Sequence, residues 1–89
     1  MKNYEDFKKL VEFIIYELQN EKIEVTAKKW AEKSPYQKRR YKEQFVYPEV
    51  WLYRKDSKRG MVITGDGLQE IYEQGGLLGT KEYIKLALF

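Results

Sequence analysis

Lysine and arginine are the side chains of this sequence whose type and spacing could support a chemical function. Residues 28–42 contain seven basic residues against one acid, and residues 54–59 contain four against one, so the two segments carry net charges of +6 and +3 in a chain of net charge +3. If the segments meet in space, they predict phosphate neutralisation and therefore nucleic-acid contact. For a single run such as 38–40, a solvated helix face without a partner is the alternative. The basic residues concerned are Lys28, Lys29, Lys33, Lys38, Arg39, Arg40, Lys42, Arg54, Lys55, Lys58 and Arg59.

Aromatic residues alternate with these cations. Stacking of unpaired bases on aromatic rings is one use of such a mixture. Packing in the core is the alternative, and it accounts for more of these rings, because Trp30 has the spacing of a core residue on the second helix and Tyr41 and Phe45 lie one turn apart on the third. The aromatic residues concerned are Tyr36, Tyr41, Tyr47, Trp51 and Tyr53.

Catalytic and metal-binding chemistry is not indicated. The sequence has no cysteine and no histidine, which removes disulfides, thiolate ligands and the commonest general base. The acids Glu5, Asp6, Glu70 and Glu73 are scattered over expected helix surfaces, and Gly65-Asp66-Gly67 lacks the spacing of a phosphate loop. We therefore expect no enzyme activity, no metal and no cofactor. The composition also predicts a cytoplasmic protein without a membrane span.

The 89 residues are enough for one modest core, and we expect a single domain over 1–89 with its core at about 4–76. Apolar residues at helical spacing predict a helix over 4–20, with Asn3 as its N-cap. Residues 23–25 suit a short edge strand. Thr26 is then expected to cap a short second helix over about 27–33, with Ala27, Trp30 and Ala31 on one stripe.

The remaining elements follow from turn and capping signals. Ser34, Pro35 and Gln37 form a capping-box pattern that predicts a third helix over about 35–46. Residues 49–55 and 60–64 are rich in β-branched and aromatic residues and predict an antiparallel hairpin with a short basic tip. A fourth helix is expected over about 67–74, ended by Gly75-Gly76, and the tail from Thr80 is expected to be a further capped helix.

This order of elements resembles the winged-helix variant of the helix-turn-helix family over about residues 4–64. The stretch from Met61 to Gly76, MVITGDGLQEIYEQGG, is similar to the second wing strand and following helix of MarR-like and PadR-like regulators. The resemblance implies an α+β, mostly α fold: a winged helix followed by one or two C-terminal helices.

Function follows from the same resemblance. It implies that residues 35–46 form the helix that enters the DNA major groove and that the hairpin tip contacts the adjacent backbone. The DNA-facing residues would be Tyr36, Gln37, Lys38, Arg39 and Lys42, with Lys55, Lys58 and Arg59 in the wing; Lys28, Lys29 and Arg40 extend the same basic surface.

The expected function is therefore binding of double-stranded DNA, as a small transcriptional regulator. The apolar tail over 77–89 suggests a homodimer, since it leaves more apolar surface than a small monomer should expose. The alternative is a protein-interaction module, such as a phage- or virus-encoded inhibitor, built on the same scaffold.

Overall fold

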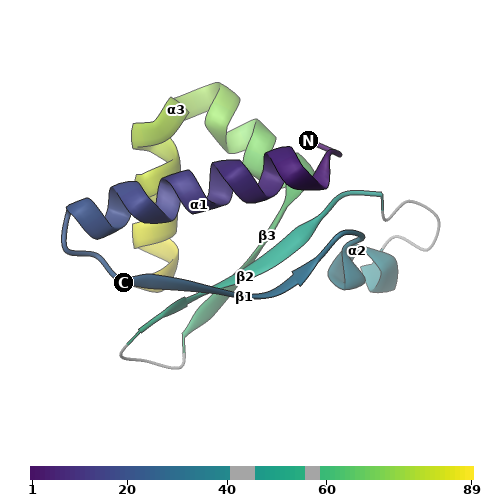
Figure 1. Cartoon of the computed structure of the whole chain (residues 1–89), viewed down its shortest axis with the longest axis horizontal. Helices are drawn as coiled ribbons and strands as arrows, with labels where there is room; N and C mark the ends of the chain where they lie inside the picture. The colour runs from purple at the N-terminus through teal and green to yellow at the C-terminus, as the bar shows by residue number, and fades with distance from the viewer. Residues whose placement is uncertain (41–45, 56–58) are drawn as a thin grey trace.

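A computed structural model describes residues 1–40, 46–55 and 59–89, and within them it shows an α+β fold that is mostly helical. Three helices accompany a three-stranded antiparallel sheet of order β1-β2-β3 (Figure 1). The elements are α1 (Tyr4–Asn20), β1 (Val25–Ala31), α2 (Pro35–Arg40), β2 (Glu49–Arg54), β3 (Gly60–Thr64) and α3 (Gly65–Leu88).

Helix α1 confirms the prediction over 4–20. The side chain of Asn3 accepts a hydrogen bond of 2.9 Å from the backbone N–H of Asp6, which satisfies one of the amide groups left free at the helix start. The residues at helical spacing, Phe7, Val11, Ile14 and Leu18, are all buried. Helix α1 therefore presents one apolar stripe to the sheet.

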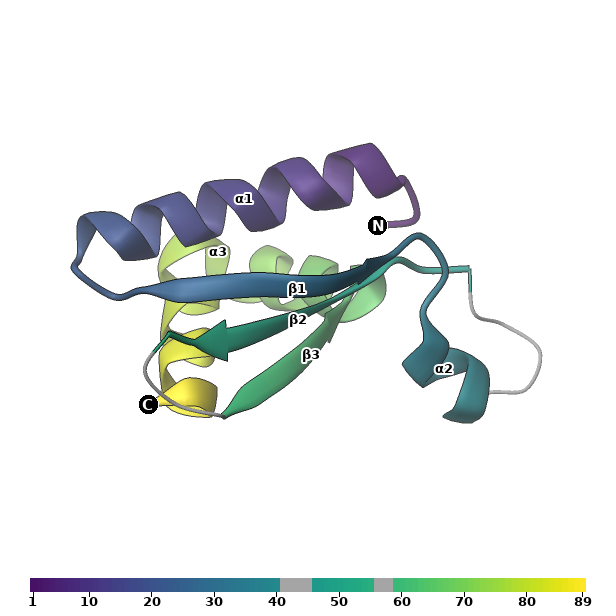
Figure 2. The same ribbon diagram turned by 60° about the horizontal axis from the view of Figure 1, so that its bottom comes forward.

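The predicted hairpin is also confirmed. Strand β2 pairs with β3 in a register that places Val50 opposite Ile63 and Leu52 opposite Met61. Because side chains alternate across a strand, these four residues lie on one face of the sheet, and that face is covered by α1 and α3. Helix α2 lies beyond one end of the sheet, on the side away from α1 (Figure 2).

The prediction of a helix over 27–33 is wrong. Residues 25–31 form strand β1, which pairs with β2 and contains a bulge between Lys28 and Ala31. Trp30 nevertheless packs against the core, where its ring meets the Phe7 ring edge to face at 6.1 Å. Its expected contact with the core is correct, although the helix that was to carry it is absent.

Helix α2 begins where the sequence predicts. Ser34 Oγ accepts a hydrogen bond of 3.0 Å from the Gln37 backbone N–H, as expected for a helix cap. The structure describes the helix as far as Arg40, and the rest of the helix expected to reach residue 46 falls on 41–45, which lie outside the described residues. Val46 itself is not helical.

Helix α3 joins the two helices expected at 67–74 and in the tail. Gly76 has φ 61° and ψ −157°, a backbone conformation open to glycine, and it breaks the helix there, as the Gly75-Gly76 pair predicted. Thr80 is not the cap that was expected, because it lies buried within the helix and donates to the Gly76 carbonyl at 2.7 Å.

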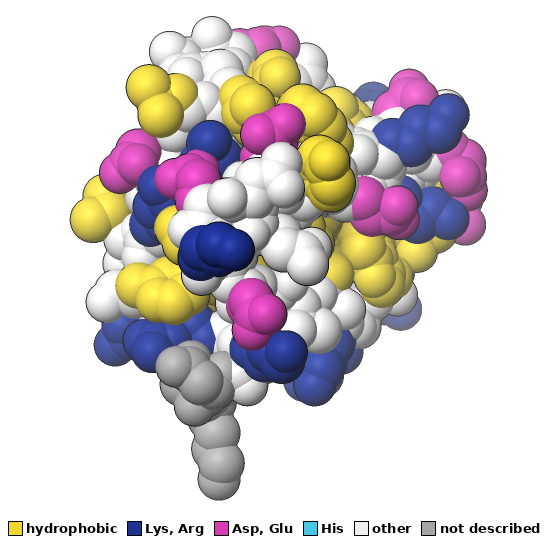
Figure 3. Space-filling model, turned by 60° about the vertical axis from the view of Figure 1, so that its left-hand side comes forward, with side chains coloured by type: hydrophobic (Ala, Val, Ile, Leu, Met, Phe, Trp, Pro, Cys, Tyr) yellow, Lys and Arg dark blue, Asp and Glu magenta, His cyan; other side chains and the backbone are white. Residues whose placement is uncertain are grey.

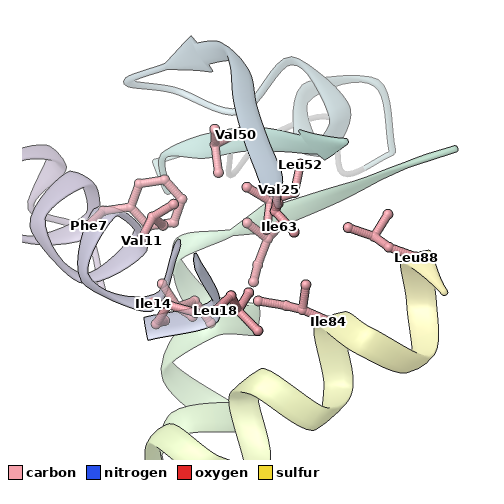
Figure 4. Close-up of a cluster of buried hydrophobic side chains, with 11 residues drawn as sticks. Phe7, Val11, Ile14, Leu18, Val25, Val50, Leu52, Ile63, Ile84 and Leu88 are labelled. Atoms are coloured by element: carbon pink, nitrogen blue, oxygen red, sulfur yellow. The ribbon is translucent and has the colours of Figure 1, made fainter. Parts of the chain in front are cut away.

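The bend at Gly76 lets the second half of α3 return to the sheet. Ile84 and Leu88 point toward Val25 and Ile63 and are almost fully buried (Figure 4). The hydrophobic core therefore extends to Leu88, and the expected boundary near residue 76 is wrong. The tail belongs in large part to the core of the protomer.

The α+β, mostly helical class is thus confirmed, and the order of elements is compatible with a winged-helix layout. Among the described residues, however, a single helix stands between β1 and β2, because residues 27–31 are part of a strand. None of the helices in these ranges is both long and apolar enough to cross a membrane.

Candidate nucleic-acid interface

The face of the sheet away from α1 and α3 carries an aromatic pair. Trp51 and Tyr53 alternate along β2 with the buried Val50 and Leu52, so they project from the opposite side of the strand. Their ring centroids are 6.3 Å apart and the ring planes differ by 25°. We call this side of the sheet, with Trp51, Tyr53 and the lysines of β1, the open face.

Gly60 allows the Tyr53 ring to lie against the sheet. It is the register partner of Tyr53 on β3, and a side-chain carbon on Gly60 would collide with the Cε1 and Cδ1 atoms of the ring. Glycine therefore fits this position because it leaves room for an aromatic ring from the neighbouring strand. The nearly parallel Trp51 ring continues the same surface.

Two lysines of β1 hold their ammonium groups over these rings. Lys28 Nζ is 5.8 Å from the Tyr53 centroid, and Lys29 Nζ is 5.8 Å from the Trp51 centroid and 5.6 Å from that of Tyr53. Such distances are within the range of cation–π attraction. Both lysines are exposed.

The bulge in β1 explains why two consecutive lysines reach one face. In a regular strand Lys28 and Lys29 would project to opposite sides. Lys29 instead adopts φ 58°, a left-handed conformation that costs a residue with a side chain about 1 kcal/mol. The backbone thus bears strain at the point where the cations meet the aromatic pair, and strain of this kind is common at functional sites.

Neither of these ammonium groups has an acidic partner in the part of the chain that the structure describes. Ion pairs formed by described residues involve other lysines, for example Lys55 with Glu24 at 3.3 Å. The contacts of Lys28 and Lys29 are instead with ring faces. Their positive charge is therefore available to an anionic ligand.

A buried polar network fixes α2 at the end of the sheet. Glu49 is 3% exposed, and its carboxylate accepts hydrogen bonds from the Ser34 hydroxyl at 2.6 Å and the Tyr36 backbone N–H at 2.9 Å. The Ser34 backbone N–H donates to the Tyr47 carbonyl at 2.8 Å. These bonds join Tyr47 and Glu49, the first residue of β2, to the start of α2.

Gln37 belongs to this network and does not face the solvent, so its expected contact with DNA is wrong. The residue is 6% exposed, and its Nε2 donates to both carboxylate oxygens of Asp66, at 2.9 and 3.0 Å. Burial alone would raise the pKa of Asp66, but hydrogen bonds from Thr64, Gln37 and the Gly67 backbone outweigh it, so the pKa is lowered. Gln37 therefore anchors α2 to the first turn of α3.

The remaining side chains of α2 form an exposed cationic end. Lys38, Arg39 and Arg40 are exposed, whereas Tyr36 is half-buried. The Arg40 guanidinium lies 5.8 Å from the Tyr36 centroid and donates to its hydroxyl at 2.8 Å. Lys42 and Tyr41 lie outside the described residues. Sequence and structure thus agree on three exposed cations here.

The hairpin tip is described in part. Lys55 and Arg59 are exposed, and Arg54 and Arg59 close the hairpin through a backbone hydrogen bond of 3.2 Å, whereas Lys58 lies outside the described residues. In Figure 3 several Lys and Arg side chains lie along the lower edge of the view, with acidic and apolar side chains among them. The expected wing is therefore basic where the structure describes it.

The structure changes the expected surroundings of two lysines and of the aromatic residues beside them. Lys28 and Lys29 were expected on a helix and lie on a strand, while the aromatic residues beside them were interpreted mainly as core. The alternation in Val50-Trp51-Leu52-Tyr53 was the available signal, since it places the two rings on one side and the two aliphatic residues on the other.

The described residues contain no group of three or more acidic side chains placed to hold a metal ion. A hollow of about 600 Å³ lies between the end of α1 and the hairpin, lined by Gln19, Lys22, Ile23, Glu24, Lys55 and Phe89. The carboxylate of Glu24 is paired there with Lys55.

Comparison of the chain with protein-family models, with curated proteins and with solved structures gives no match.

Proposed function

We propose that this protein binds nucleic acid through its open face and the exposed end of α2. The observation that carries the proposal is the pair of ammonium groups, from Lys28 and Lys29, held over the Trp51–Tyr53 pair on a sheet face that no described helix covers. Cations beside aromatic rings supply the two contacts that nucleic acids offer, which are phosphate neutralisation and base stacking.

Lysine contacts of this kind favour affinity over sequence selectivity. An ammonium group is a point charge that neutralises phosphate, whereas bases are distinguished by bidentate groups that reach their edges. Gln37, the one amide expected to reach DNA from α2, is buried and bonded to Asp66. The proposed binding is therefore largely independent of sequence.

Duplex DNA and transcription regulation are the finer part of the proposal and come from the winged-helix resemblance. In that arrangement α2 would be the element placed on the duplex, with Lys38, Arg39 and Arg40 on phosphates. The basic hairpin tip would act as the wing. The exposure of these α2 cations and the basic residues at the tip support this docking.

The test measures binding at a series of salt concentrations. Fluorescence anisotropy of labelled 20-nucleotide duplex and single-stranded DNA is the readout. We expect log affinity to fall linearly with log salt, with a slope that decreases by about one for each phosphate contact removed from a duplex. The variants are Lys28→Ala/Lys29→Ala and Lys38→Ala/Arg39→Ala. Each should weaken binding and flatten the slope.

The control is Lys9→Ala, which removes an exposed charge from α1 on the opposite side of the sheet. It should leave both the affinity and the slope as in the parent. If the parent protein binds neither form of DNA at low salt, the proposal is wrong.

A second candidate, the protein-interaction module, has support from the exposed side of α3. Leu78 and Leu86 are 69% and 81% exposed, and Tyr83 and Phe89 are about half exposed. Large exposed apolar groups are typical of surfaces that bind protein, including a second copy of the same chain. Light scattering of the parent and of Leu86→Lys over a range of concentrations tests the homodimer, because the charge should shift a dimer toward monomer.

A further inference from the structure

We infer that the nucleic acid bound by the open face is single-stranded, and that two neighbouring unpaired bases stack on Trp51 and Tyr53. This inference rests on the proposed function and names its ligand more closely. It follows from three features of the open face: the orientation of the rings, the position of the lysines and the glycine beneath Tyr53.

The two rings form one platform. Their planes differ by only 25° and their centroids are 6.3 Å apart, so the two rings are close neighbours of similar orientation. Aromatic residues on an uncovered sheet are a known means of stacking two or three successive bases. Neighbouring residues of the same side of β2 therefore have the spacing for two nucleotides of one strand.

A duplex cannot use such a platform. The faces of paired bases are already stacked on one another, so only their edges and the backbone are accessible to a protein. Stacking on a side chain requires an unpaired base, and it is tolerant of sequence because every base has a π-face. The aromatic pair therefore selects for strand state and not for sequence.

The lysines supply the charge that the platform lacks. Lys28 and Lys29 hold their ammonium groups 5.6–5.8 Å from the ring centroids, without an acidic partner among the described residues. When a base occupies a ring face, the flexible lysine side chain moves to the flanking phosphate. The same two residues thus occupy the rings in the free protein and neutralise the backbone in the complex.

Gly60 is a positioning residue in this arrangement. The Tyr53 ring lies where a side chain on Gly60 would be, so any larger residue displaces the ring from the sheet. Gly60→Ala should therefore weaken binding of a single strand while the lysines and both rings are still present. This variant separates the orientation of the platform from its composition.

The direct test uses the fluorescence of Trp51. Oligo(dT), oligo(rU), a dA·dT duplex and inorganic polyphosphate are titrated into the parent protein and into Trp51→Phe at low salt. We expect both single strands to quench the fluorescence of the parent, and the duplex and polyphosphate, which offer no unpaired base, not to quench it. Trp30 contacts Phe7 on the covered side, so Trp51→Phe reports the baseline without stacking.

The single-stranded arms also identify the source of the ligand. Oligo(dU) is added for this purpose, because it differs from oligo(rU) only at the 2′ position. A lower dissociation constant for oligo(rU) than for oligo(dU) assigns the site to RNA, the reverse assigns it to DNA, and equal values mean that stacking ignores the sugar.

The second test measures affinity. Trp51→Leu and Tyr53→Leu keep an apolar side chain but remove the ring, and each should weaken binding of oligo(dT) by about tenfold. Trp51→Phe should restore most of that loss, since it restores a ring. The control is Tyr16→Leu on α1, which removes an aromatic side chain that is 60% exposed and should leave the affinity unchanged.

The outcomes separate this inference from the proposed function. Equal affinity for duplex and single strand, no quenching, and leucine variants that bind as the parent does would overturn the stacking inference and leave phosphate binding intact. A parent protein that binds none of the nucleic acids at low salt would overturn both. Circular dichroism of each variant excludes unfolding, and Gly60→Ala decides the question if a ring variant does not fold.

Discussion

The two faces of strand β2 differ in composition as sharply as the core and the surface of a larger protein. On the covered face Val50 and Leu52 are at most 1% exposed and contact the apolar stripes of α1 and α3. On the open face Trp51 and Tyr53 are half-buried and lie under lysine ammonium groups. Consecutive residues of one strand therefore serve opposite purposes.

The difference separates the side chains of the sheet that stabilise the fold from those that could bind a ligand. Aliphatic side chains pack closely with helices and stabilise the fold through buried apolar area. Aromatic rings beside lysine ammonium groups bury less apolar area in the core and are better suited to bind a ligand. We therefore expect substitutions on the covered face to change stability and substitutions on the open face to change binding.

The largest effect is expected from removal of residues 80–89. This deletion takes away Thr80, Ile84 and Leu88, which are all at most 1% exposed, and uncovers the sheet residues beneath them. We expect loss of the cooperative unfolding transition, measured by circular dichroism during heating. A truncated protein that melts cooperatively near the parent temperature would show that the covered face does not need the second half of α3.

Leu52→Ala should have the next largest effect. It leaves a cavity on the covered face and should lower the free energy of unfolding by about 3 kcal/mol. Tyr53→Ala, one residue away on the open face, should lower it by about 1 kcal/mol or less. Urea denaturation measures both. Equal losses would contradict the distinction between the two faces.

Lys29→Gly should move stability and binding in opposite directions. Glycine relieves the left-handed strain at φ 58° and should raise the free energy of unfolding by about 0.5 kcal/mol, while loss of the ammonium group weakens nucleic-acid binding. The matched control is Lys22→Gly at the end of α1, where φ is 65°. It should raise stability similarly and leave binding unchanged. A Lys29→Gly protein that binds as the parent does would remove Lys29 from the site.

The smallest effect is expected from the ion pairs between Glu21, which follows α1, and two lysines of α3. Lys81 and Lys85 hydrogen-bond the Glu21 carboxylate at 2.6 and 2.8 Å and lower its pKa from 4.5 to about 2. Because the folded-state pKa lies below the unfolded one, the stabilisation is present above pH 4.5 and is lost as the pH falls toward 2. The pair is exposed, so the effect is small and screened by salt.

Glu21→Gln should therefore differ from the parent in urea denaturation at pH 6 and converge with it near pH 2. Nucleic-acid binding should not change, since Glu21 lies on the covered side. A difference in stability that is constant over this pH range would show that the carboxylate charge is not its source.

The sequence was sufficient for the elements whose signals are local. The apolar spacing of α1, the cap at Asn3, the hairpin and the break at Gly76 were all predicted from neighbouring residues. The prediction of a helix over 27–33 was wrong, because these residues belong largely to strand β1, and the bulge in that strand explains the error. It brings Ala27 and Trp30, three residues apart, to the same side of β1, and this spacing imitates one face of a helix.

The candidate site was predictable in its charges and not in its arrangement. Exposed Lys38, Arg39 and Arg40 follow from the basic run alone. The assignment of Trp51 and Tyr53 to the open face does not, because Val50-Trp51-Leu52-Tyr53 is apolar on both sides and either side could have met the helices. Only the packing of α1 and α3 decides which side is left uncovered.

The bulge at Lys29 has a consequence for self-association. In the described sheet β1 pairs on one side with β2, so its other edge presents backbone N–H and C=O groups that a strand of another molecule could continue. The bulge interrupts the regular spacing of those groups, and the lysines at 28 and 29 add charge repulsion between copies that approach edge to edge. We therefore expect these two residues to oppose edge-to-edge pairing of copies through the first strand.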